Sequence, residues 1–101
     1  MTVIDINSGK NISKNETAIF EINKEAAIEI ARQLRLRNIS GMIIIDFINM
    51  KSKEHMDELV NLLKEHIKKD EVPCTFMDVT RLGLVELTRK KTYKSLKEML
   101  E

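Results

Sequence analysis

The sequence predicts an α/β fold, in which a mixed, largely parallel sheet of about four strands packs against two main helices. Segments of strand character alternate along the chain with two longer segments of helical period. A helix that links two strands in this way crosses over in the right-handed sense and brings the strands into one sheet. The 101 residues amount to the length of one domain, so we expect residues 1–101 to form a single unit.

The beginning of the chain predicts a strand, a loop and a long helix. Residues 2–7 alternate between apolar and polar side chains from Ile4 onward, which is typical of a short strand. Residues 8–15 are small, polar and locally basic, as in a loop. Over residues 16–37 the apolar side chains recur at steps of three and four, so this segment is predicted to be an amphipathic helix capped by Asn15. The apolar stripe consists of Ile19, Ile22, Ala26, Ile30 and Leu34.

The middle of the chain predicts a buried strand and a second helix. Residues 42–48 are apolar except for Asp46, and such a run is typical of a parallel strand that is covered on both faces. Ser52 can cap a helix that continues to about residue 69. The inner face of that helix is expected to consist of Met56, Leu59, Val60, Leu63 and Ile67.

The last third predicts two more strands. Residues 74–79 follow Pro73 and have the composition of a strand. Residues 84–89 alternate well enough for a fourth strand, although a helical turn is an alternative. Residues 95–101 have helical composition but little apolar surface to bury.

Composition excludes several classes of protein. Hydrophobic residues make up 43% and charged residues 33%, as in globular proteins. The formal net charge of +1 gives no overall signal for nucleic acid, so any basic RNA surface must be local. Cys74 is the single cysteine, which excludes an intrachain disulfide and a cysteine-only zinc site. No apolar run approaches the roughly 20 residues of a membrane span and no signal peptide is evident, so we expect no membrane span and a cytoplasmic location.

Two aspartates occupy unusual positions in the predicted strands. Asp46 interrupts the apolar run, and Asp5 lies between Ile4 and Ile6. A carboxylate in such a place requires a cation, a metal or hydrogen-bond donors. Both would lie toward the carboxyl ends of neighbouring strands, where open sheets place their sites, and carboxylates suit Mg²⁺ or Mn²⁺. The alternative is that each aspartate caps a loop or pairs with a basic side chain.

Three segments resemble the ribonuclease E/G family. Residues 23–50 are similar to the family's "N-L-E-A-A-x-E-I-A-R-Q-L-R-L-R" helix and the "G-G-x-I-x-I-D-F-I-D-M" strand that follows it. Residues 4–9 resemble its "D-x-N-[ST]" motif, and residues 82–91 resemble "G-L-x-E-[LM]-[ST]-R". The sequence departs from the pattern at Asn49, where the family usually has Asp, and at Ser40, where it usually has Gly.

The resemblance implies a deoxyribonuclease-I-like subdomain that contains the family's catalytic metal site. By this likeness Asp5 and Asp46 hold the Mg²⁺, and Asn7 orients Asp5. The implied reaction is hydrolysis of single-stranded RNA by metal-activated water, which leaves a 5′-phosphate and a 3′-hydroxyl. The resemblance also implies that the chain is one part of a larger, homo-oligomeric endoribonuclease. We therefore expect little or no activity from residues 1–101 alone.

Four basic residues are candidates for contact with RNA phosphates, namely Arg35, Arg37, Arg89 and Lys90. The alternative is a solvated helix face on which nearby Glu residues balance the positive charge. Two other functions stay open. One is a non-catalytic RNA-binding or assembly module that retains the fold, and the other is a metal-dependent deoxyribonuclease or phosphoesterase built on the same aspartates.

Overall fold

The computed structural model describes residues 1–6 and 15–91, and its elements follow the order that the sequence predicts. The segment 84–89 is a strand, so the alternative of a helical turn is wrong. Asn7, most of the expected loop and the expected helical tail lie outside the described residues. The elements are β1 (Thr2–Asp5), α1 (Glu16–Leu36), β2 (Gly41–Asp46), α2 (Lys53–Ile67), β3 (Cys74–Val79) and β4 (Val85–Arg89).

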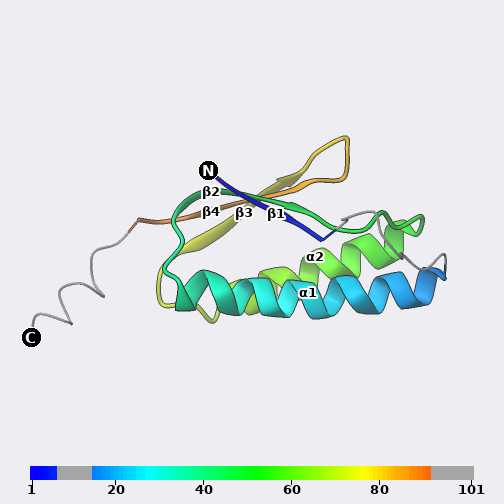
Figure 1. Ribbon diagram of the computed structural model, residues 1–101, viewed down its shortest axis with the longest axis horizontal. Coiled ribbons are helices and arrows are strands. Elements are labelled where there is room, and N and C mark those ends of the chain that lie inside the picture. Colours follow the sequence, from blue (N-terminus) through cyan, green and yellow to red (C-terminus); the bar gives the residue numbers. More distant parts are fainter. Residues whose placement is uncertain (7–14, 92–101) are drawn as a thin grey trace, which may run out of the picture.

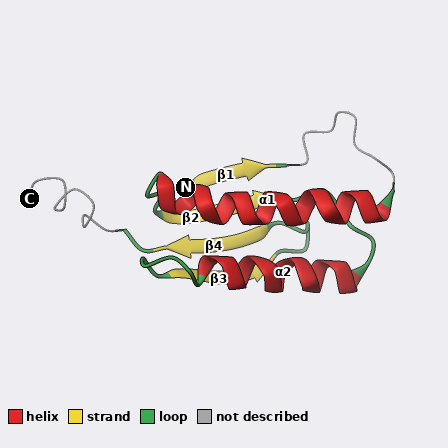
Figure 2. Cartoon of the chain, turned by 90° about the horizontal axis from the view of Figure 1, so that it is seen from below, coloured by secondary structure: helices red, strands yellow, loops and turns green. Residues whose placement is uncertain are grey.

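The four strands form one mixed sheet in the order β1-β2-β4-β3. β1 pairs with β2 in parallel, whereas β4 is antiparallel to both β2 and β3. β1, β2 and β3 therefore run in one direction and β4 runs against them, as Figure 2 shows. The expected mixed sheet with two helices is confirmed, although within the described chain the parallel pairing is confined to β1 and β2.

A tight turn explains why β4 runs against its neighbours. The N–H of Gly83 donates to the carbonyl of Thr80 (2.9 Å), and the N–H of Leu84 donates to the Thr80 hydroxyl (3.1 Å). Gly83 has a φ of +82°, a conformation that glycine adopts without the steric cost that other residues meet. The chain thus folds back directly after β3, and β4 inserts between β3 and β2.

Both helices lie on one face of the sheet (Figure 1). Ile43, Ile45 and Leu87 point toward the helices and are 0% exposed. On the opposite face Val3 is 62% exposed and Met42 is 47% exposed. The expectation that β2 is covered on both faces is therefore wrong for this part of the chain, because both described helices pack on the same side. We call the uncovered side the open face; it includes Val3, Asp5, Met42 and Asp46.

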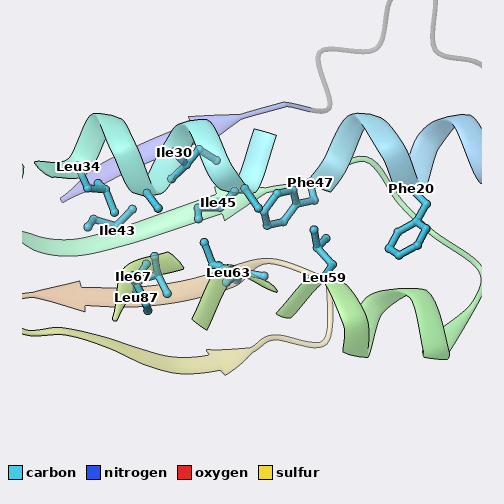
Figure 3. Close-up of a cluster of buried hydrophobic side chains, with 13 residues drawn as sticks. Phe20, Ile30, Leu34, Ile43, Ile45, Phe47, Leu59, Leu63, Ile67 and Leu87 are labelled. Atoms are coloured by element: carbon cyan, nitrogen blue, oxygen red, sulfur yellow. The ribbon is translucent and has the colours of Figure 1, made fainter. Parts of the chain in front are cut away.

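The core fills the space between the two layers (Figure 3). From α2, Leu59 and Leu63 are fully buried, as the sequence predicts. On α1 the buried stripe differs from the predicted one, because Ile22 is 41% exposed and Asn23 is buried in its place. The buried residues of α1 are Ile19, Phe20, Asn23, Ala27, Ile30, Ala31 and Leu34.

Both predicted helix caps are confirmed. The Asn15 side chain accepts hydrogen bonds from the N–H groups of Thr17 (2.9 Å) and Ala18 (3.2 Å). The Ser52 hydroxyl accepts one from the N–H of His55 (3.2 Å). Each cap satisfies backbone donors that have no partner inside the helix. Neither helix in the described part of the chain is long and apolar enough to cross a membrane.

Candidate metal site

Asp5 and Asp46 are direct partners in the sheet. They are the last residues of β1 and β2, and the parallel register places one opposite the other. The N–H of Ile6 donates to the Asp46 carbonyl (2.9 Å), which holds the two strand ends together. The fold therefore brings together two carboxylates that are far apart in the sequence, at the edge where open α/β sheets place ligands.

The carboxylates of Asp5 and Asp46 belong to the open face. Side chains alternate along a strand, and Ile45 is fully buried against the helices, so Asp46 points the other way. Asp5 is exposed and Asp46 is half-buried. Within residues 1–6 and 15–91, neither side chain has a hydrogen bond or an ion pair. The described residues thus offer no support for the alternative in which each aspartate pairs with a basic side chain.

The donor set fits a hard divalent cation. Mg²⁺ is usually bound by one or two carboxylates and keeps several of its waters. Among the residues that the structure describes, no group of three or more His, Cys, Asp or Glu side chains could hold a metal. The two carboxylates, one exposed and one half-buried, are oxygen donors of the kind that suits Mg²⁺ or Mn²⁺ better than zinc. Asn7, the third residue of the predicted site, lies outside the described residues.

The predicted phosphate contacts lie at the other end of the sheet. Arg89 is the register partner of Gly41, the first residue of β2, whereas Asp46 is the last residue. Five steps along a strand separate these ends by about 16 Å. Arg37 ends α1, close to the start of β2, and Lys90 follows Arg89 directly. The structure therefore brings the two aspartates together but does not bring the basic residues to them.

The guanidinium of Arg89 is engaged inside the fold. The side chain is 3% exposed. Its Nε and Nη2 donate to the Asp70 carboxylate (2.7 and 3.2 Å), and its Nη1 donates to the Asn38 side chain and the Ile39 carbonyl, both at 2.9 Å. Arg89 thus joins β4 to the segments that follow both helices. Its contacts are structural in this fold, and a phosphate at the surface would not reach it.

Burial and the Arg89 contact shift the pKa of Asp70 in opposite directions. Burial raises the pKa of the Asp70 carboxyl. The hydrogen bonds from Arg89 and the Val72 N–H, with the positive charges of Arg89 and Arg35, outweigh that effect and lower the pKa below its ordinary value. Asp70 is therefore ionised at neutral pH, as a partner of a buried arginine must be.

Of the remaining basic candidates, Arg37 belongs to a charged row on the surface of α1. The Nε of Arg37 donates to Gln33 Oε1 (2.9 Å), and Gln33 Nε2 donates to Glu29 (2.6 Å). Arg32 forms an ion pair with the same Glu29 (3.1 Å). The Gln33 hydrogen bond lowers the pKa of Glu29; burial acts against it, and the charge and hydrogen bond of Arg32 lower the pKa further. Arg37 lies on this solvated, glutamate-balanced row, while Arg35 is half-buried and Lys90 is exposed.

Sequence reasoning missed one buried polar residue near the site. Asn23 is 0% exposed, and its side-chain amide contacts the backbone of Ile48, two residues after Asp46. A signal was present, because Asn23 lies four residues from Ile19 and four from Ala27, on the buried side of α1. An amide at such a position indicates a specific hydrogen-bond partner.

Comparison with known proteins gives one consistent family. The model of the Ribonuclease E/G family matches residues 1–92. Ribonuclease G of Escherichia coli (strain K12) is 43% identical over 102 residues, which cover 99% of this chain and 21% of that protein. Ribonuclease G of Haemophilus influenzae is 44% identical with the same coverage. Ribonuclease E of Nostoc sp. is 42% identical over 98% of this chain and 15% of that protein. The chain therefore spans about a fifth or less of the length of these curated relatives.

Proposed function

Since the chain belongs to the ribonuclease E/G family, we propose that it is the metal-binding part of an endoribonuclease that hydrolyses single-stranded RNA. The observation that supports this most directly is the register pairing of Asp5 with Asp46 on the open face. Family membership alone would fit any segment of such an enzyme. The paired carboxylates are what make this segment a candidate for the reaction centre.

In this proposal Asp5 and Asp46 hold Mg²⁺, or Mn²⁺ in its place. A cation bound there lowers the pKa of a water molecule and neutralises negative charge on the scissile phosphate. The chain's own contribution is to fix both carboxylates at the ends of paired strands and to leave the open face accessible to RNA. Asn7 is proposed to orient Asp5 through a hydrogen bond. The products would be a 5′-phosphate and a 3′-hydroxyl.

The basic candidates for RNA binding lie far from the two aspartates. Arg37 and Lys90 lie about 16 Å from the aspartates, to judge by the length of β2. They would contact phosphates several positions away from the one that is cleaved, together with Arg35 where its side chain is accessible. Because two carboxylates leave most of the coordination of Mg²⁺ to water, and the basic candidates that could position RNA lie at the other end of β2, we propose that residues 1–101 alone cleave RNA slowly or not at all.

The first test is a titration of the chain with Mg²⁺ and Mn²⁺, followed through its amide resonances. We expect saturable changes at Ile4 to Ile6 and at Ile45 to Phe47, and their loss in the Asp5→Asn/Asp46→Asn variant. Asp57→Asn/Glu58→Gln is the matched control, since it also removes two negative charges, from exposed positions of α2 away from the open face. Unlocalised changes, or equal changes in the double variant, would refute the metal site.

A second measurement concerns activity. A labelled single-stranded RNA is incubated with the chain and Mg²⁺, and we expect no more cleavage than with Asp46→Asn. Metal-dependent cleavage that disappears in Asp46→Asn would contradict the proposed inactivity and strengthen the proposed reaction. A DNA strand of the same sequence, tested in parallel, distinguishes the ribonuclease from a deoxyribonuclease built on the same site.

One observation favours a second candidate function, an assembly module. β1 is an edge strand, and beside it a groove of about 410 Å³ runs between the strand and α1. Ile4, Ile30 and Leu34 are among the apolar side chains that line the groove. Edges of this kind accept another strand. Saturable self-association of the chain without metal binding would favour this function over the ribonuclease.

Three further expectations stay predictions. The family membership does not test the deoxyribonuclease-I-like description of the fold, the homo-oligomeric state or the cytoplasmic location. Sedimentation of the intact enzyme addresses the oligomeric state. Cell fractionation addresses the compartment.

A further inference from the structure

The buried side chain of Asn23 binds the segment that follows the candidate metal site. Its Nδ2 donates to the carbonyl of Ile48 (2.8 Å), and its Oδ1 accepts from the N–H of the same residue (3.0 Å). Asn23 is 0% exposed and Ile48 is 7% exposed. One amide therefore satisfies both backbone groups of a single buried residue.

The end of β2 explains why such a partner is needed. β2 ends at Asp46, and beyond it Ile48 has no strand partner among residues 1–6 and 15–91. Buried backbone groups are costly when they are left unpaired. Only an Asn or Gln side chain offers a donor and an acceptor in the geometry of a peptide group. Asn is a weaker helix former than Ala, so its presence inside α1 is explained by this contact rather than by the helix.

A second contact from α1 holds the same segment. The Glu16 carboxylate accepts hydrogen bonds from the N–H groups of Lys51 (2.8 Å) and Ser52 (3.2 Å). Glu16 and Asn23 thus tie residues 47–52 to the first two turns of α1. On its other side, the Asp46 carbonyl accepts from Ile6. The backbone of Asp46 is therefore fixed by β1 before it and by α1 after it.

We propose that Asn23 is a positioning residue for Asp46. The inference rests on the proposed function, since the position of Asp46 matters for the reaction only if its carboxylate binds the cation. A metal ligand must be held within about 0.5 Å of its working position. When the Ile48 contact is lost, the end of β2 gains freedom at its last residue, and the Asp46 carboxylate no longer faces Asp5 in one fixed arrangement.

The test compares Asn23→Leu, which preserves the size of the side chain but removes both hydrogen bonds, with Leu63→Ala. Leu63 is fully buried on α2, so Leu63→Ala destabilises the core and leaves both Asn23 hydrogen bonds to Ile48 in place. The first readout is amide exchange of Ile6 without metal, divided by that of Leu87 in the same variant. The second is the Kd for Mn²⁺ from paramagnetic broadening at Ile6 and Phe47, measured where each variant is folded.

We expect the exchange ratio and the Kd to rise at least fivefold in Asn23→Leu and to stay within twofold in Leu63→Ala. Equal effects in the two variants, or none in Asn23→Leu, would overturn the proposal and make Asn23 a structural residue only. If the wild-type chain gives no saturable Mn²⁺ broadening, the proposed metal site fails. The ratio of Ile6 to Leu87 amide exchange then still shows whether Asn23 fixes the end of β2. The proposed role of Asn23 in positioning a metal ligand is overturned in that case.

Discussion

At the scale of single residues, the strongest constraint is the buried ion pair between Asp70 and Arg89. Both side chains are 5% exposed or less, and their nearest atoms are 2.7 Å apart. A buried pair is weak support for stability as a whole, since the two ions lose their hydration. Removal of one partner is a different matter, because the other charge then stays buried and uncompensated.

We expect Asp70→Asn to lower the free energy of unfolding by about 3 kcal/mol at pH 7, since it leaves the Arg89 charge without its partner. Urea unfolding measures the loss. The double variant Asp70→Leu/Arg89→Met should lose less than the single one, because it removes both charges together. A loss below about 0.5 kcal/mol, the range of ordinary surface substitutions, would contradict the structural role of the pair.

The same pair predicts a dependence on pH. The folded-state pKa of Asp70 lies below its ordinary value, so its contribution is complete above the unfolded-state pKa of about 3.9. As the pH falls below that value toward the folded-state pKa, the contribution is lost. The stability difference between wild type and Asp70→Asn should therefore be constant from pH 7 to pH 5 and shrink below pH 4. A difference that stays constant down to pH 2 would exclude Asp70 as its cause.

At the scale of elements, the helices depend on their caps. Ser52→Ala removes the acceptor for the His55 N–H, and we expect it to cost about 1 kcal/mol of stability. Asn61→Ala, in the exposed middle of α2, is the matched control and should be neutral or slightly stabilising, since Ala has the higher helix propensity. Thermal unfolding of the two variants compares them directly. Equal melting temperatures would show that the cap contributes nothing.

The order and type of the elements could be predicted from local pattern. Periodicity marked α1 and α2, and the short polar side chains of Asn15 and Ser52 marked where each begins. The pairing of Asp5 with Asp46 also followed from the strand–helix–strand order. These features depend on neighbours in the sequence or on the general handedness of crossovers, so they can be predicted from the sequence alone.

Other features depend on contacts between distant segments. The placement of β4 between β2 and β3 depends on the turn at Gly83 and on long-range pairing, which periodicity does not report. The sequence predicts Arg89 as a surface cation, whereas in the fold its guanidinium bonds to Asp70 and Asn38. Asn23 differs from Ile22 by one position on the helix, and only packing decides which of them is buried.

At the scale of the whole molecule, the two faces of the sheet have different roles. Both helices lie on one side of the sheet (Figure 1), and the buried core lies on that side. The two aspartates belong to the open face, because side chains alternate along each strand. The basic candidates lie at the far end of β2 from Asp46.

The strand order also predicts the order in which strand pairs form during folding. β3 and β4 are joined by a short turn, whereas α1 and its connections separate β1 from β2. Because closing a long loop costs more entropy than closing a short one, distant pairings form late in folding. During refolding with pulsed hydrogen exchange, we expect protection of Lys90, whose N–H donates to the Pro73 carbonyl (2.9 Å), to precede that of Ile6; simultaneous protection would contradict this order. Asp5 would then pair with Asp46 in the last stage of folding. A partly folded chain therefore lacks the complete site, and a cation that binds there binds only the native state.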